Sequence, residues 1–325
     1  MDELLKLLRR AAAPLEAGPA RERYRGSLLG LACGNALGLQ VEGVPADEIR
    51  RHLPAGVRDI HPDEAARDWD DDVAQALVLG DCLLSGPLDV DVFLERLVEW
   101  MEVNGRGIGR QTWEVLQKAK AGAEGTAAAW AVWEASGRYR AGNGAVMRCA
   151  PVALRWRLQP QRLVKDAVSS ARATHYDPRC VWTTVATCAV LALELAGADW
   201  TLEELAEALE DAGAPPEVIV AVELSESPEV ADLELDEWES MGYTIRAMTA
   251  ALWTATHAED FEATLLAVIN AGGDTDTNGA VAGAVLGARF GAAAVPGRWK
   301  ERLPNPWEME GLADRLLEAS SGSEG

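Results

Sequence analysis

Cysteine and histidine are scarce in this sequence. Its 325 residues include 5 cysteines and 4 histidines. The number of cysteines is odd and none of them belongs to a CxxC pair, which argues against a disulfide framework and against a structural zinc site. Most of them lie in apolar runs, and we expect small buried hydrophobic side chains there. The positions are Cys33, Cys82, Cys149, Cys180 and Cys188.

Positive charge is also in short supply. The chain has 30 lysines and arginines against 52 aspartates and glutamates, which gives a formal net charge of −22. A negative field of this size repels polyanions, because nucleic-acid binding depends on neutralising phosphates. We therefore expect no non-specific nucleic-acid binding.

Long apolar runs and a signal segment are missing as well. No uninterrupted apolar run approaches the ~18 residues that a membrane helix needs. Residues 1–14 (MDELLKLLRRAAAP) place acids ahead of bases and contain no apolar stretch followed by a small-residue cleavage site, unlike a signal peptide. These absences predict a cytoplasmic protein that does not bind membranes.

Helical periodicity is what the sequence has in abundance. Apolar residues recur at three- and four-residue spacing, as at Val181, Val185 and Ala189, whereas alternating β-branched runs are rare. This spacing is typical of amphipathic helices, and the Gly/Ala-rich segment 279–294 suits close helix packing. We predict an all-α fold. Four tryptophans in helical patterns are expected in its core, namely Trp113, Trp130, Trp182 and Trp253.

The breaks between these patterns are short and contain glycine or proline, so none of them resembles a domain linker. We predict a helical appendage at 1–19, a single all-α domain at 20–319 and a flexible tail at 320–325. The acidic segment 223–239 has two interpretations, a solvated face and a surface lid.

Three consecutive acids stand where a helix is expected to begin. Asp70, Asp71 and Asp72 follow Trp69 and precede an amphipathic run. One acid at this place is ordinary capping, but three neighbouring negative charges repel one another unless a cation or solvent separates them. A metal site and a solvated acidic turn both remain open for this segment alone.

A second acidic group lies in NAGGDTDTNGAVAG (270–283). Asp274, Asp276 and Thr277 offer two carboxylates and a hydroxyl within one helical turn, and these are oxygen donors that Mg²⁺ or Mn²⁺ prefers. The spacing does not fit an EF-hand. If the two groups meet in one site, about five carboxylates would be compensated by two divalent ions.

The ordered series of motifs resembles the ADP-ribosylglycohydrolase family, which includes the dinitrogenase-reductase-activating glycohydrolases. The resemblance covers residues 23–317, and its specificity comes from the order of eight motifs. These are RYRGSLLGLACGNALGLQVEG (23–43), WDDDVAQAL (69–77), RGIG (106–109), GNGAVMRCAP (142–151), THYDP (174–178), MGYT (241–244), GGDTDT (272–277) and VPGRWKERL (295–303).

The resemblance implies an orthogonal helical bundle around a central dinuclear site with two Mg²⁺ or Mn²⁺ ions. Carried over position by position, the ligands are Asp71, Asp72, Asp274, Asp276 and Thr277. One of these four aspartates would orient or deprotonate the attacking water. Glu42 matches a glutamate that positions the substrate or assists proton transfer, although a lone surface glutamate is its ordinary interpretation.

Three positions depart from the family pattern. Asp70 and Val73 stand where threonines are usual, and Asn35 stands where aspartate is usual. Asp70 can still act as a ligand through its carboxylate, which would tighten metal binding and leave less Lewis acidity for the substrate. Asn35 keeps the hydrogen-bonding shape of an aspartate without its charge.

The implied substrate is ADP-ribose linked to an arginine or serine side chain of a protein, or a small ADP-ribose conjugate. Gly-rich turns at helix starts can bind its pyrophosphate through backbone N–H groups. Each candidate also has a plain structural interpretation as a helix connection, a capping neighbour or a core tyrosine. The candidates are Gly107, Gly109, Asn143, Gly144, His175 and Tyr243.

The expected activity is therefore metal-dependent hydrolysis of the bond between ADP-ribose and its acceptor. Two alternatives stay open: a non-catalytic ADP-ribose binder or structural protein on the same fold, and a phosphoesterase that releases AMP. We take a monomer as the default oligomeric state.

Overall fold

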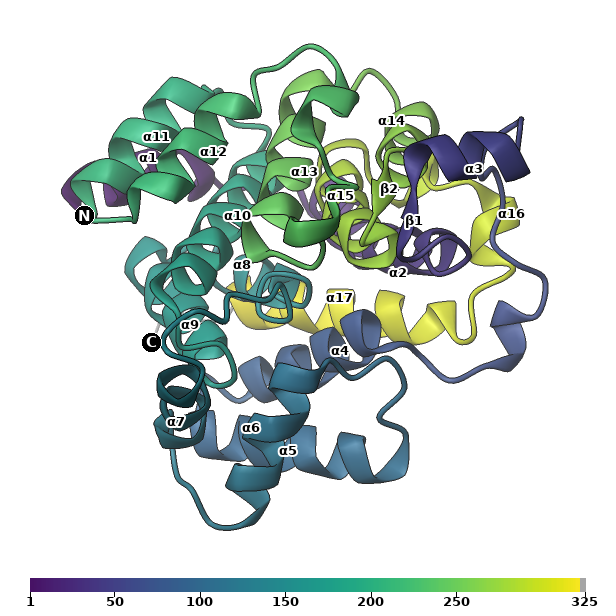
Figure 1. Cartoon of the computed structure of the whole chain (residues 1–325). Coiled ribbons are helices and arrows are strands. Elements are labelled where there is room, and N and C mark those ends of the chain that lie inside the picture. Colours follow the sequence, from purple (N-terminus) through teal and green to yellow (C-terminus); the bar gives the residue numbers. More distant parts are fainter. Residues whose placement is uncertain (322–325) are drawn as a thin grey trace.

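The chain folds almost entirely into helices, which confirms the predicted all-α fold (Figure 1). The computed structural model describes residues 1–321, and the part of the predicted tail beyond Ser321 lies outside this range. The helices are α1 (Asp2–Ala11), α2 (Ala17–Gly38), α3 (Ala46–His52), α4 (Asp71–Leu84), α5 (Val90–Val103), α6 (Arg110–Lys120), α7 (Ala127–Ala135), α8 (Ala150–Trp156), α9 (Pro160–Arg172), α10 (Pro178–Ala196), α11 (Leu202–Asp211), α12 (Pro216–Leu224), α13 (Thr244–His257), α14 (Phe261–Asn270), α15 (Thr275–Phe290), α16 (Gly297–Lys300) and α17 (Pro306–Ser321).

The remaining regular elements are short. Within residues 1–321 there is one antiparallel pair of two-residue strands, in which Val44 pairs with Gly273 and Pro45 with Gly272. The strands are β1 (Val44–Pro45) and β2 (Gly272–Gly273), and the 3₁₀ helices are η1 (Glu64–Ala66), η2 (Val230–Leu233), η3 (Trp238–Ser240) and η4 (Ala292–Ala294).

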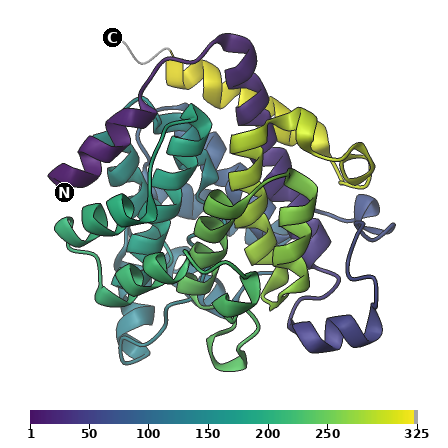
Figure 2. The same cartoon turned by 90° about the horizontal axis from the view of Figure 1, so that it is seen from above.

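Two glycine-lined helices, α2 and α15, lie side by side at the centre of the fold (Figures 1 and 2). Their glycines meet in pairs, Gly26 with Gly287, Gly30 with Gly283 and Gly34 with Gly279, and a Cβ on any of them would overlap the facing backbone. The helices are therefore antiparallel and in backbone contact. The start of α15 consequently lies beside the end of α2, where Thr275 Oγ1 donates a 2.8 Å hydrogen bond to the carbonyl of Gly38.

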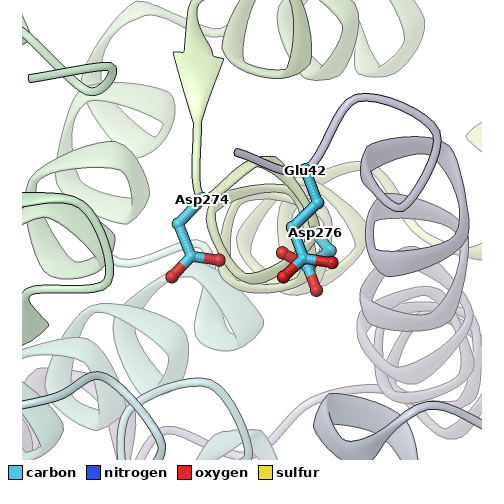
Figure 3. A group of neighbouring side chains, drawn as sticks. All are labelled: Glu42, Asp274 and Asp276. Atoms are coloured by element: carbon cyan, nitrogen blue, oxygen red, sulfur yellow. The ribbon is translucent and has the colours of Figure 1, made fainter. Parts of the chain in front are cut away.

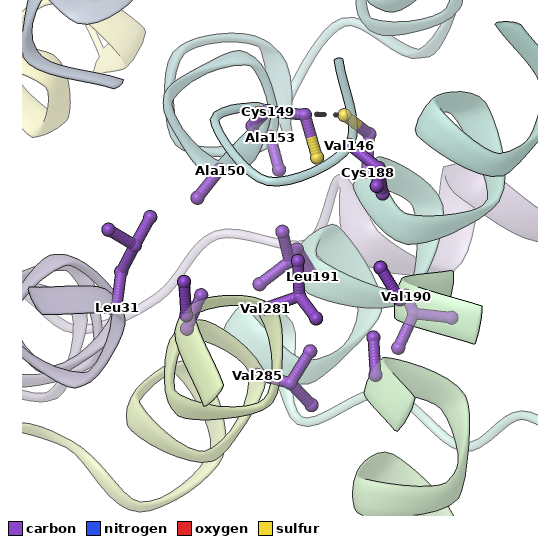
Figure 4. Packing of buried hydrophobic residues seen from close by; sticks show 14 of the residues in the cluster. Leu31, Val146, Cys149, Ala150, Ala153, Cys188, Val190, Leu191, Val281 and Val285 are labelled. Carbon is purple, nitrogen blue, oxygen red and sulfur yellow. Dashed lines mark hydrogen bonds between the residues drawn. The ribbon is translucent and has the colours of Figure 1, made fainter. Parts of the chain in front are cut away.

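The core surrounds this pair. Figure 4 shows side chains of α2, α8, α10 and α15 packed together, among them Leu31, Leu191 and Val281. All five cysteines are free thiols, and four of them are buried while Cys82 is half-buried. In the same view Cys188 Sγ lies 3.6 Å from the carbonyl oxygen of Cys149. The prediction of small, mostly buried hydrophobic cysteines is confirmed.

Helix α10 corrects one expectation. It is 19 residues long with a mean hydropathy of 1.4, which is long and apolar enough by composition to cross a membrane. A search for uninterrupted apolar runs missed it because threonines and single charged residues interrupt the run without lowering the mean. Here 83% of the apolar window is buried inside the protein, and α10 contacts α8, α9, α13 and α15. It serves as a core helix of this fold.

The prediction for the tryptophans is wrong at two positions. Trp253 is buried, but Trp113 on α6 and Trp130 on α7 are each 47% exposed. Helix α6 packs on α5 and α7, and α7 packs mainly on α6, away from the central pair (Figure 1). Helical spacing indicates that a helix has an apolar face, but it does not say whether another element covers that face.

The two chain ends pack against the fold as far as they are described. Helix α1 buries Leu4, Leu7 and Leu8, and Arg157 donates from Nη1 to the carbonyls of Ala11 and Ala13. At the other end Ser320 lies in the last turn of α17 and is buried.

Candidate active site

The first acidic group lies at the beginning of α4. Asp70 is the N-cap residue, with extended backbone (φ −72°, ψ 168°), and Asp71 and Asp72 form the first turn. A helix N-terminus favours negative charge because its free N–H groups and dipole are positive. All three side chains are buried, so the helix start alone does not account for them.

The second acidic group lies at the beginning of α15. Asp274 is the N-cap residue, and Asp276 and Thr277 follow in the first turn. Because α2 and α15 are antiparallel, Glu42 in the loop after α2 lies beside them (Figure 3). The β1–β2 pair ties that loop to the start of α15.

The two groups meet at Asp276. Carboxylate oxygens of Glu42, Asp274 and Asp276 lie within 4.8 Å of one another, and so do those of Asp70, Asp72 and Asp276. Asp276 thus belongs to both sets. An all-oxygen donor set of this kind suits Mg²⁺ or Mn²⁺ and lacks the sulfur and nitrogen ligands typical of zinc.

Two buried oxygens in this cluster need a cation or a proton. Asp72 Oδ1 and Asp276 Oδ1 find no hydrogen-bond partner among residues 1–321. Burial, followed by repulsion from neighbouring carboxylates, raises the pKa of Asp72 and Asp276 well above the usual range. Leaving such acceptors unpaired is costly, and the residues therefore fit divalent cations. The Thr277 side chain hydrogen-bonds to Asp72 and opposes part of that rise.

Asp71 and Asp70 have polar neighbours of their own. Gln75 Nε2 lies 3.3 Å from Asp71 Oδ2, and burial raises the pKa of Asp71 well above its usual range. Arg106 Nε lies 3.5 Å from Asp70 Oδ1, and Asn35 Nδ2 lies 3.4 Å from Asp70 Oδ2. The charge that Asp70 brings where the family has threonine is thus faced by an arginine.

Two further positions of the family motifs are Val73, where a threonine is usual, and Glu42, which matches the motif glutamate. Val73 is buried in the hydrophobic core, so it offers no ligand. Glu42 is exposed at the mouth of the site, and partial burial of its carboxyl, together with Asp274 and Asp70, raises its pKa.

A cavity of about 250 Å³ lies over the acids. Its walls include all the predicted substrate-binding residues except Tyr243, namely Gly107, Gly109, Asn143, Gly144 and His175. Gly107 has a positive φ of 77°, and a Cβ there would come to 2.5 Å from Asp70 Oδ1. This turn therefore requires glycine both for its conformation and for its approach to the acids.

Asn143 joins the cavity wall to the second acidic group. Its Nδ2 donates a 2.8 Å hydrogen bond to Asp274 Oδ2, and its backbone N–H donates to the carbonyl of Gly242 at 3.0 Å. An isolated bridge between Gly142 and Tyr243 continues this contact. The GNG and MGYT motifs thus hold each other in place.

A larger groove of about 740 Å³ adjoins the cavity and shares Arg110, Gln111 and Gly142 with it. Tyr243 lies here, half-buried, with its ring 5.6 Å from the Arg179 guanidinium. Four arginines line the groove, and sequence reasoning missed them because they come from separate segments and all four lie outside the eight motifs. They are Arg110, Arg140, Arg179 and Arg246.

The segment 223–239 forms part of the outer wall. Leu233 and Leu235 are buried, and Asp236 Oδ2 accepts a 2.9 Å hydrogen bond from the backbone N–H of Ala46. Glu237 and Glu239 line the groove. The segment is acidic on its outer side, as a solvated face would be, but two buried leucines anchor it to the fold. Neither a solvated face nor a surface lid therefore describes it fully.

Comparison with known proteins agrees with this architecture. A family model described as ADP-ribosylglycohydrolase matches residues 17–325. A solved structure titled "ADP-ribosylglycohydrolase-related protein complex" superposes with a TM-score of 0.76 at 33% identity, covering 93% of this chain and 99% of that one. The chain belongs to the ADP-ribosylglycohydrolase family, whose members are metal-dependent hydrolases of ADP-ribose linkages.

Two named relatives indicate the range of acceptors in the family. ADP-ribosylarginine hydrolase Tri1 of Pseudomonas putida is 30% identical, with 96% of this chain and 82% of that protein covered. ADP-ribosyl-[dinitrogen reductase] glycohydrolase of Rhodospirillum rubrum is 28% identical, with 90% and 94% covered. These similar values do not single out the dinitrogenase-reductase-activating type to which the motifs were compared.

Proposed function

We propose that this protein is a divalent-metal-dependent hydrolase that releases ADP-ribose from the arginine side chain of a modified protein. The observation that carries the proposal is that a cavity lined by acidic residues adjoins a groove lined by basic ones. An acid-lined cavity opens into a groove that presents four arginines and two tyrosines. ADP-ribose has the same polarity along its length, with a polyhydroxylated ribose at one end and a diphosphate and adenine at the other.

The diphosphate would lie toward the groove. Arg110 and Arg140 both pair with Glu114, and Arg179 pairs with Asp177 at 2.8 Å. Paired arginines keep free N–H donors and a fixed geometry, which suits phosphate oxygens. Tyr243 supplies a ring beside Arg179 on which a purine can stack.

The distal ribose would lie over the acids. Asp70, Asp72 and Asp276 would hold one ion, and Glu42, Asp274 and Asp276, with Thr277 nearby, a second. When bound, two Mg²⁺ or Mn²⁺ ions supply Lewis acidity that holds ribose hydroxyls and makes a bound water more acidic. Breaking the glycosidic bond builds positive charge on the ribose, which the surrounding carboxylates stabilise.

Proton transfer falls to carboxyl groups at the cavity. Glu42, at the mouth and with a raised pKa, is placed to exchange a proton with the leaving acceptor. One of Asp71, Asp72, Asp274 and Asp276 orients or deprotonates the attacking water; all four line the cavity.

An arginine acceptor is favoured by the charge of the rim. Glu42, Glu237 and Glu239 are exposed around the opening, and a negative rim attracts a cationic guanidinium. The similarity to the arginine-specific relative Tri1 points the same way. Serine linkages and small ADP-ribose conjugates are the competing substrates. That the protein acts as a cytoplasmic monomer stays a prediction.

The test incubates the metal-loaded protein with ADP-ribosyl-arginine and ADP-ribosyl-serine peptides, with and without EDTA, and identifies the products by mass. We expect EDTA-sensitive release of free ADP-ribose from the arginine peptide, lost in Asp276→Asn and retained in Asp63→Asn, an exposed aspartate outside the cavity. Release of AMP would instead indicate a phosphoesterase. Binding of ADP-ribose without any release would indicate a non-catalytic binder.

A further inference from the structure

A fully buried arginine without a carboxylate partner lies behind the cavity. Arg148 has 0% exposure and forms no ion pair within the described chain. It donates to Gln75 Oε1 at 2.5 Å, to the Ser170 carbonyl at 3.1 Å and to Thr174 Oγ1 at 2.6 Å. Burial lowers its pKa, yet an arginine keeps its proton in proteins and has only donors to offer. Every group that it bonds must therefore accept.

This constraint determines where the Thr174 hydroxyl points. The hydroxyl oxygen accepts from Arg148, so its single proton is left for another partner. His175 Nδ1 lies 2.9 Å away and is the one acceptor found for that proton among residues 1–321. Nδ1 is therefore unprotonated, and the proton of the neutral ring is on Nε2.

A second threonine–histidine pair in the chain lacks this constraint. Thr256 Oγ1 lies 2.9 Å from His257 Nδ1 and 3.1 Å from the carbonyl oxygens of both Leu252 and Trp253, and Nδ1 lies 3.1 Å from the Trp253 carbonyl. The Thr256 hydroxyl can therefore donate either to a carbonyl or to Nδ1, and its hydrogen bonds allow both neutral forms of the His257 ring. At Thr174 the arginine removes this choice.

His175 Nε2 faces the cavity. His175 lines it, and the nearest atoms to a Cβ built on Gly144 are His175 Cε1 at 2.7 Å and Nε2 at 3.0 Å. No hydrogen-bond partner for Nε2 is found in the described part of the chain. Burial and the nearby Arg148 lower the pKa of His175 to about 3, so the ring is neutral at physiological pH.

The same arginine acts in a second direction. Because Gln75 Oε1 accepts from Arg148, the amide nitrogen of Gln75 must face the other way, where it lies 3.3 Å from Asp71 Oδ2. Arg148 thus aligns one donor toward the acids and, through Thr174, a second toward the cavity.

We infer that Arg148 is a positioning residue that, through Thr174, holds His175 as the Nε2–H form, so that this N–H donates to an oxygen of the bound ADP-ribose. The ligand named here rests on the proposed function. The state of the ring does not, because it follows from hydrogen bonds within the protein.

The first experiment measures the state of the ring in the protein without ligand. Long-range ¹⁵N–¹H correlation at pH 7.5 distinguishes protonated from unprotonated ring nitrogens, and His175→Asn and His257→Asn assign the signals. We expect a proton on Nε2 of His175 and none on its Nδ1. A proton on Nδ1 of His175, or a doubly protonated ring, overturns the inference.

Substitutions at Thr174 then distinguish the effect of the hydrogen bond that residue 174 donates to His175 Nδ1 from a general effect on the structure. In Thr174→Asn the amide oxygen can accept from Arg148 while the NH₂ donates to Nδ1, so the ring should stay as in the wild type. In Thr174→Asp, which has the same size, both neighbours must donate, and the proton should move to Nδ1. Thr174→Val adds no charge and should shift the Nδ1 resonance to that of an unbonded nitrogen. An unchanged ring in the aspartate and valine variants contradicts the role of Thr174.

Titration calorimetry with ADP-ribose completes the test. We expect Thr174→Asn to bind close to the wild-type affinity and Thr174→Asp to bind about tenfold to one-hundredfold more weakly, the value of one hydrogen bond to a charged oxygen. Equal affinities of the two variants would refute the donor role of His175. If the wild type does not bind ADP-ribose at all, the proposed function fails while the result on the ring still stands.

Discussion

Replacing Gly30 by alanine tests the central contact of the fold. The new methyl group would lie 2.7 Å from the carbonyl carbon of Gly283 and closer still to its oxygen, whereas two carbons pack at about 3.5–4.0 Å. Helices α2 and α15 would have to separate by about 1 Å. Both sides of the clash are backbone, so no side chain can move away instead.

The expected cost follows from this geometry. Overpacking of a core typically costs about 1–3 kcal/mol, and a clash with rigid backbone belongs at or above the upper end, about 3 kcal/mol. For 325 residues, at an unfolding entropy of about 2.1 cal/mol/K per residue, that lowers the Tm by about 4–5 °C. The shift also separates Glu42 from Asp276, so the variant should bind Mn²⁺ more weakly at temperatures where it is still folded.

The measurements are thermal melts and Mn²⁺ titrations of Gly30→Ala against Gly311→Ala. Gly311 is an exposed glycine of α17 with no atom within 4 Å of an added Cβ, so its substitution should leave the stability unchanged or raise it by up to about 1 kcal/mol. If both variants melt within 1–2 °C of the wild type, the two central helices are not in rigid backbone contact and the reasoning is refuted.

Three further predictions concern the site. In EDTA the Tm should fall as the pH rises from 5 to 8. The reason is that acids with raised pKa values, Asp72 and Asp276 among them, bind more protons in the native state than in the unfolded state. Mn²⁺ should remove this pH dependence, and a Tm that rises with pH in EDTA would contradict the prediction. Asp276→Asn should lower turnover about 100-fold or more and reduce the number of ions bound in calorimetry, whereas unchanged stoichiometry would place the metals elsewhere. Gly107→Ala should lower kcat about tenfold or more, while Gly297→Ala, which lies outside the cavity and has no atom within 4 Å of an added Cβ, should not. Equal rates of the two variants would show that the Gly107 turn does not need to approach the acids.

Much of the fold and of the acidic cluster could be predicted from local patterns. Helical spacing identifies helices without reference to the rest of the chain, and the two acidic motifs were recognisable as helix starts rich in oxygen donors. The Gly/Ala-rich segment 279–294 was expected to pack closely. Its partner was not found, because the glycines of α2, spaced four residues apart at Gly26, Gly30 and Gly34, show their role only when the facing helix is known.

The rest of the site depends on contacts that no single segment encodes. Gln75, Arg148 and Thr174 each lie inside one of the motifs, yet the hydrogen bonds of Arg148 link it to residues 26 and 73 positions away. The arginines of the groove carry no local signal at all, since an arginine beside a glutamate on a helix is usually a solvated pair. The exposure of Trp113 has the same origin, because burial is decided by neighbours distant in sequence.

The backbone contact between α2 and α15 also sets the order in which the protein can mature. The glycines that meet come from opposite ends of the chain, as Gly30 and Gly283 do, so an emerging polypeptide must carry α2 unsatisfied until nearly all of it has been synthesised. During that interval the chain cannot assemble the full acidic cluster, because Asp274 and Asp276 arrive with the same late helix. A molecule truncated before residue 270 would therefore expose an apolar, glycine-rich helix and be a substrate for chaperones or proteases rather than a weak enzyme.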